Sequence, residues 1–187
     1  MKKPFLFALL VSLSQFGVAC EGSDGSEETD GGQEEHNEDE VNEEGCEHME
    51  EGPSESVTAT ASLEGTQTDI STAHTRFDIT LLEDSGSYTG YVTYDASEEG
   101  ELFLFLNANV PVSVTRLSDG SNVEIEETDE AFAFCDAVSV LHVLDVELGT
   151  LALEFGPTSE SEVRAVLELT TGDHDHDDDH DDDHDDE

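Results

Sequence analysis

Histidines and carboxylates alternate at the end of the chain, in the segment DHDHDDDHDDDHDDE from Asp173 to Glu187. Neutral imidazole is a favoured ligand for zinc, copper and nickel, and carboxylates add charge and oxygen ligands. We therefore predict a metal-binding tail whose candidate ligands are His174, His176, His180, His184, Asp175 and Asp177. Zinc is the expected metal. Copper and nickel are alternatives, as is a tail with no tightly bound ion.

The charge of this tail also predicts its behaviour. Eleven acids in 15 residues repel one another, so we expect a disordered segment that orders locally around a captured ion. Ordering entropy should keep the affinity modest, and protonation of imidazole below about pH 6.5 should weaken it further. In composition the tail resembles the His/Asp-rich segments of bacterial periplasmic zinc-uptake proteins, which implies metal handling. The alternative is an acidic tail that only solubilises the protein.

A second candidate group consists of Cys46, His48, His74, Cys135 and His142. Two cysteines and three histidines suit tetrahedral zinc or copper, and C-x-H is a feasible local chelate, but the spacings match no standard zinc finger. One hypothesis keeps the cysteines in a disulfide and uses the three histidines as secondary metal ligands. The competing hypothesis makes His142 a hydrogen-bonded core residue, since it shares the phase of the valines and leucines around it.

Catalysis finds no support in the sequence. The chain has no G-x-S-x-G or H-E-x-x-H motif, no glycine-rich phosphate loop and no lysine after Lys3. A catalytic carboxylate pair cannot be singled out among 49 acids. We expect that the protein is not an enzyme.

The overall charge limits the possible partners. The formal net charge is -44 and the sequence pI is about 4.1. Such a chain is repelled by nucleic acids and by anionic leaflets, since both are polyanions. We expect a monomer that attracts cations. An acidic proteome adapted to salt would also explain this composition.

The first 20 residues, MKKPFLFALLVSLSQFGVAC, combine two lysines, an apolar run and small residues before Cys20. This pattern is typical of a secretory signal peptide over residues 1–19. It resembles a bacterial lipoprotein signal, in which the first mature residue is a lipidated cysteine, although Gly17-Val18-Ala19 lacks the usual leucine. The resemblance implies lipidation at Cys20 and export to the bacterial cell envelope, with the membrane contacted only through the anchor. Gly-Val-Ala also suits an ordinary signal peptidase.

Cysteine arithmetic supports this interpretation. If Cys20 carries lipid, Cys46 and Cys135 remain as an even pair in an oxidising compartment, where a disulfide persists. In the chain-entropy model, closing that loop would stabilise the fold by roughly 4 kcal/mol. The alternative is a free Cys46 in a flexible linker.

Residues 20–52 are rich in Glu, Gly, Ser and Asp, which predicts a disordered acidic tether. Residues 53–172 instead show short alternating runs between turn signals, which predict one antiparallel β-sandwich or jelly-roll domain. The nine expected strands are Ser56–Leu63, His74–Leu82, Ser87–Ala96, Gly100–Ala108, Val110–Leu117, Asn122–Glu127, Val138–Glu147, Gly149–Gly156 and Glu162–Thr170. The tail forms residues 173–187.

The successions YVTYDASEEGELFLFLNANVPVSVTRLSDGS and VLDVELGTLALEFGP are similar to the β-sandwich domains that follow bacterial protease catalytic domains, the pre-peptidase C-terminal type. Leu151 stands where those domains have tyrosine after Gly-Thr. The resemblance implies an accessory module without catalysis. Together these features predict an envelope lipoprotein that binds or buffers divalent metal and passes it to a transporter or receptor. The alternative is a sandwich that recognises a protein or glycan.

Overall fold

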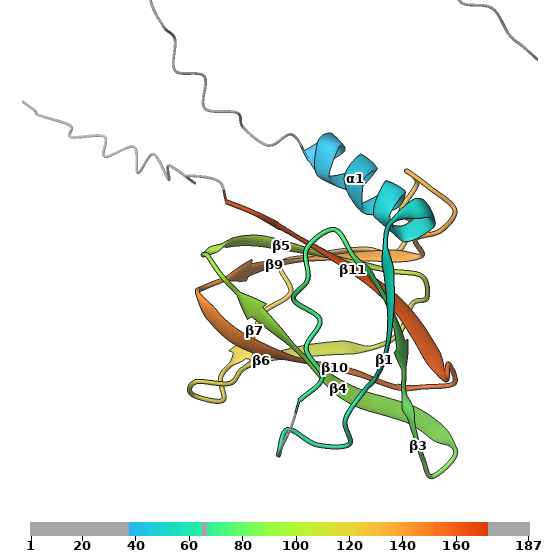
Figure 1. The fold of residues 1–187 in the computed structure, drawn as a ribbon, viewed down its shortest axis with the longest axis vertical. Coiled ribbons are helices and arrows are strands. Elements are labelled where there is room, and N and C mark those ends of the chain that lie inside the picture. Colours follow the sequence, from blue (N-terminus) through green and yellow to red (C-terminus); the bar gives the residue numbers. More distant parts are fainter. Residues whose placement is uncertain (1–37, 65–66, 172–187) are drawn as a thin grey trace, which may run out of the picture. The chain divides into compact units, whose positions relative to one another are not determined.

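The computed structural model describes residues 38–64 and 67–171, and within these ranges the chain forms two stacked β-sheets with one helix on an outer face (Figure 1). This confirms the expected all-β sandwich. The elements are α1 (Glu38–Glu51), β1 (Ser54–Thr58), β2 (Arg76–Thr80), β3 (Leu82–Asp84), β4 (Ser87–Ala96), β5 (Gly100–Leu106), β6 (Val112–Arg116), β7 (Asn122–Val123), β8 (Glu127–Asp129), β9 (Val140–Val146), β10 (Gly149–Thr158) and β11 (Glu162–Thr170).

Sheet A has the strand order β1-β2-β11-β5-β9-β8, and sheet B has the order β3-β4-β10-β6-β7. The paired strands are antiparallel except β1 and β2, which run parallel. Side chains at every second position of a strand face inward, so one face of each sheet supplies the core between them. That core includes Phe77, Leu104, Leu144, Leu153 and Phe155, all buried. The central strand β5 also buries Phe103 and Phe105 on its outer face.

Every expected strand region contains a strand, but two of them divide between the sheets. His74–Leu82 becomes β2 in sheet A and β3 in sheet B, and Asn122–Glu127 likewise divides into β7 and β8. Alternation of side chains cannot reveal where a chain crosses from one sheet to the other. The crossings give the sandwich eleven described strands rather than nine.

The predicted disordered tether through Gly52 is wrong over its last part, because Glu38–Glu51 forms helix α1. Its buried residues are Val41, Gly45, Cys46 and Met49, which pack with Phe105 and its neighbours in a second apolar cluster outside the sandwich core. Val41, Cys46 and Met49 are the only apolar side chains among its 14 residues, which is too few to predict an amphipathic helix from the sequence. Packing on sheet A stabilises α1 instead. No helix among the described residues is both long and apolar enough to cross a bilayer.

The predicted disulfide is confirmed, with Cys46 of α1 joined to Cys135 across 89 residues of sequence. Gly45 lets the helix approach closely, since a Cβ there would lie 2.4 Å from the Phe105 ring. At the other end of α1, Arg76 Nη1 donates to the Met49 carbonyl over 3.1 Å. A cation at the C-terminal end of a helix also complements the helix dipole. These contacts fix α1 against sheet A.

Candidate metal centre

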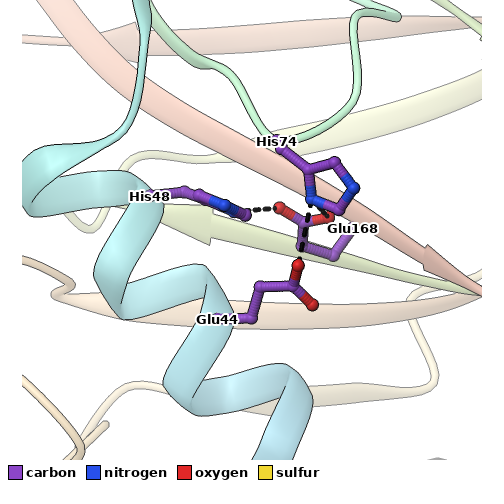
Figure 2. A group of neighbouring side chains, drawn as sticks. All are labelled: Glu44, His48, His74 and Glu168. Carbon is purple, nitrogen blue, oxygen red and sulfur yellow. Dashed lines mark hydrogen bonds and ion pairs between the residues drawn. The ribbon is translucent and has the colours of Figure 1, made fainter. Parts of the chain in front are cut away.

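Four side chains from three separate parts of the chain converge where α1 meets sheet A: Glu44, His48, His74 and Glu168 (Figure 2). One ligand atom from each lies within 4.8 Å of all the others. His48 Nδ1 is 2.7 Å from Glu168 Oε1. His74 Nδ1 is 3.1 Å from Glu44 Oε1 and 3.3 Å from Glu168 Oε2. The two imidazole rings have centroids 4.9 Å apart.

The helix supplies two members of this group. Glu44 and His48 are four residues apart, and such a pair lies on one face of an α-helix. The buried positions Gly45 and Met49 adjoin that face, so packing on sheet A fixes how far the pair extends over β11. Cys46 lies between Glu44 and His48 in the sequence, and its disulfide to Cys135 holds the same turn of the helix.

His74 comes from the loop before β2 and has a positive φ of 54°. The left-handed conformation is uncommon for residues other than glycine and tends to persist at functional sites. Thr75 beside it is buried, and the Arg76 amide donates to the Pro53 carbonyl over 2.9 Å. These anchors place an imidazole that is 57% exposed above the carboxylate of Glu168.

Glu168 lies on β11 with its side chain on the helix-facing side of sheet A, in register with Phe103 of β5. Only 6% of this residue is exposed, although it is an acid. Burial raises the pKa of the Glu168 carboxyl, while the hydrogen bond from His48 and the nearby His74 act in the opposite direction. A buried carboxylate is costly unless it is paired or coordinates a metal, so this acid requires its neighbours.

The geometry suits a small divalent ion. Zinc bound tetrahedrally at about 2.0 Å places its ligand atoms about 3.3 Å apart. The nitrogen–oxygen pairs here lie 2.7 to 3.3 Å apart and the whole set lies within 4.8 Å, so the side chains would draw together around an ion. Two imidazoles and two carboxylates form an accepted ligand set for zinc. The side chain of Glu44 is 43% exposed, and a small pocket beside it is lined by Glu40, Val41 and Thr170. An ion therefore has a route from solvent.

His142 does not belong to this site, so the three-histidine hypothesis is wrong in one member. On β9 it is in register with Leu104, whereas Glu168 is in register with Phe103, the adjacent residue. Adjacent strand residues point to opposite faces, so His142 faces the sandwich core. It is buried, Thr128 Oγ1 lies 2.9 Å from its Nδ1, and burial lowers the pKa of its imidazole. The competing expectation of a hydrogen-bonded core histidine is confirmed.

Other predicted residues lie elsewhere. Cys46 and Cys135 are in the disulfide and so are not available as thiolate ligands. Cys20 and the tail ligands His174, His176, His180, His184, Asp175 and Asp177 lie outside the described residues, and their roles stay predictions.

Sequence reasoning missed both acids of the site. The E-x-x-x-H spacing of Glu44 and His48 was a usable signal, but only if that segment had been recognised as helical. Glu168 directly follows Ala165, Val166 and Leu167, three consecutive buried apolar residues of β11. That position was the second signal.

Comparison with the models of known protein families and with curated proteins found no match for this chain.

Proposed function

We propose that this chain is an exported, lipid-anchored protein of the bacterial cell envelope that binds and buffers a divalent transition metal, foremost zinc. The observation that carries the proposal is the convergence of Glu44, His48, His74 and Glu168, with ligand atoms within 4.8 Å. The acidic character of the chain supports it, because a formal charge of -44 raises the local concentration of cations.

Capture at this centre replaces hydrogen bonds by metal bonds. The imidazole Nδ1 atoms that now lie 2.7 to 3.3 Å from carboxylate oxygens would bind the ion once any proton on them has left. The ion also neutralises the buried Glu168 carboxylate, which the fold holds at a cost. The half-exposed His74 and Glu44 form the side of the centre at which exchange occurs.

The tail belongs to the same proposal as a second, weaker set of ligands. β11 carries Glu168 and ends at Thr170, and His174 follows four residues later in the sequence. Ions collected by the histidines of the tail would therefore be released close to the centre. A transporter or receptor would then receive them by ligand exchange.

Calorimetric titration with zinc tests the assignment. The oxidised chain without its signal peptide is compared with a version ending at Gly172, and the double variant His48→Ala/His74→Asn is made in the shorter version. Asparagine tolerates the positive φ at position 74. We expect the shorter protein to bind one ion tightly, and the double variant to lose that ion.

A matched control keeps the test specific. Glu43→Gln/Glu47→Gln removes two exposed carboxylates from α1 and leaves the centre intact, so it should retain the tight ion. If the version ending at Gly172 binds no zinc, the tail holds all the metal and the assignment to this centre is wrong. If the control loses affinity as far as the double variant does, the binding is only general attraction to an acidic surface.

Export and anchoring have their own test. Mass spectrometry of the mature protein should find Cys20 as the first residue, carrying lipid. A Cys20→Ala variant should leave the membrane fraction without change in its zinc affinity.

A further inference from the structure

A second pocket lies on the other flank of α1, at the edge of sheet A. Phe103, Phe132 and Phe134 form its aromatic part, and the acids Glu38, Glu127 and Asp129 also line it. Phe134 is 51% exposed, which is unusual for so large an apolar side chain. None of these six residues belongs to the metal centre.

The pairing of the strands places acids and rings side by side. Phe103 of β5 is in register with Val143 of β9, and Val143 with Glu127 of β8. In the same way Asp129 is in register with Leu141. The loop after β8 brings Phe132 and Phe134 over this surface, with ring centroids 5.4 Å apart, and the disulfide at Cys135 holds that loop. The pocket is therefore built on fixed elements.

The chemistry of the pocket favours an organic cation over a metal ion. Phenyl rings offer a metal no lone pairs, whereas their faces attract ammonium and guanidinium groups. Guanidinium is planar and weakly hydrated, stacks on aromatic rings and pairs with carboxylates through two parallel hydrogen bonds. Asn42, in the pocket wall, has a buried Oδ1 that accepts no hydrogen bond within the described part of the chain. An entering N–H group is the partner that this oxygen lacks.

We propose that this pocket, which we call the aromatic–acidic pocket, binds an arginine side chain of a basic partner polypeptide. A polypeptide fits because β8 is the outer strand of sheet A in the described ranges, so an extended segment has a strand edge beside the pocket. The charges fit as well, since the exposed acids Glu124, Glu126 and Glu130 flank β8. The proposal is independent of metal binding.

The test is NMR titration of the chain without its signal peptide, in chelator and low salt. The probe is the capped peptide Ac-Gly-Thr-Arg-Thr-Gly-amide, compared with versions carrying lysine or uncharged citrulline. We expect saturable shifts of the Asn42 side-chain amide and of the Phe132 and Phe134 rings, strongest for arginine and absent for citrulline. Phe134→Ala should weaken binding roughly two- to five-fold, as expected for an exposed cation–π contact.

Charge variants distinguish binding in the pocket from general attraction of a cationic peptide to an acidic surface. Glu127→Gln/Asp129→Asn should weaken peptide binding more than the control Glu160→Gln/Glu162→Gln, which removes two exposed acids at the turn between β10 and β11. Equal losses from the two pairs would overturn the proposal, as would saturable binding of the citrulline peptide or no shift with arginine. In a separate titration without chelator, calcium chloride that moves the same resonances at lower concentration than the peptide would show an inorganic cation site and also overturn it.

Discussion

The two flanks of α1 carry two different combinations built from the same acidic composition. On one flank, carboxylates meet the imidazoles of His48 and His74, and Glu168 is buried. On the other, carboxylates meet phenyl rings, and Glu127 stays exposed. The partner of the carboxylate therefore decides which cation fits. Nitrogen lone pairs favour a metal, and aromatic faces favour an organic cation.

Burial makes the second difference between the flanks. A carboxylate that is 6% exposed must be neutralised by a neighbour or a ligand, whereas an exposed carboxylate is satisfied by water. The candidate metal centre thus holds a buried acid at a cost in stability that a bound cation would relieve. In the aromatic–acidic pocket, Glu38 and Glu127 are exposed and already hydrated. A ligand relieves no buried charge there, so it should bind weakly and reversibly.

The largest expected effect comes from the disulfide, because it serves both flanks. Replacing it through Cys46→Ala/Cys135→Ala should lower the free energy of unfolding by about 4.6 kcal/mol, the loop-closure value for a bridge that spans 89 residues. Urea denaturation of the variant and of the reduced wild-type protein measures this loss. Zinc affinity and peptide binding should both fall, since the bond fixes α1 and the loop of Phe132. A variant that keeps full affinity for both ligands would show that packing alone positions them.

The next largest effect is expected at Gly45, where the helix contacts Phe105. An added Cβ would meet the ring at 2.4 Å, so Gly45→Ala forces α1 away from sheet A. Overpacking of this kind costs about 1–3 kcal/mol, partly offset by the better helix propensity of alanine. Thermal unfolding and zinc titration check it. If Phe105 turns aside without cost, stability rises instead, and Gly45→Ala should then stabilise the Phe105→Leu protein by the same amount as it stabilises the wild type.

Glu168→Gln sharpens the contrast between buried and exposed acids. Burial raises the pKa of Glu168, so the folded protein binds that proton more tightly than the unfolded chain and loses stability as pH rises through the raised value. Glutamine does not ionise. The melting temperature of the metal-free variant should therefore exceed that of the wild type increasingly from pH 4 to pH 8, while zinc affinity falls about ten-fold or more.

The matched variant is Glu127→Gln, which removes an exposed acid. It should not change zinc affinity, because Glu127 lies outside the candidate centre. A Glu168→Gln protein that melts lower than wild type at pH 8 without metal would mean that the carboxylate stabilises the fold as an ion.

The sequence was sufficient for the sandwich because short β-rich runs between turn signals are local features, and β2 alternates the buried Phe77 and Ile79 with polar neighbours. The disulfide could be predicted by counting: of the three cysteines, Cys20 precedes the acidic stretch and was assigned to lipidation, which left Cys46 and Cys135 as a pair. The helix escaped prediction because its stability comes from tertiary contacts: Gly45 against Phe105, Met49 in the second cluster and Cys46 to Cys135. None of these contacts leaves a periodic pattern in an acidic segment.

The candidate centre was half predictable for a related reason. His48 and His74 were candidates by residue type, but their selection over His142 depends on which face of sheet A each one reaches. Glu44 and Glu168 were hidden among 49 acids. Only the fold shows that Glu168 is buried, and burial is what distinguishes it from the solvated acids around it.

The smallest expected effect is the coupling between the two flanks. Both ligands are cations, so occupation of one site should weaken the other by repulsion. At about 0.15 M salt the Debye length is about 8 Å, and screening across a helix should hold the change below about two-fold. Titrating the arginine peptide with and without saturating zinc measures this change in affinity.

By linkage, the peptide should alter zinc affinity by the same factor. Stronger binding of the peptide in zinc would contradict simple repulsion, because it would require α1 to move as a unit and carry Glu38 and Asn42 with it. Gly45→Ala, which loosens the contact of α1 with Phe105, should then abolish the coupling, whereas repulsion alone would survive that change.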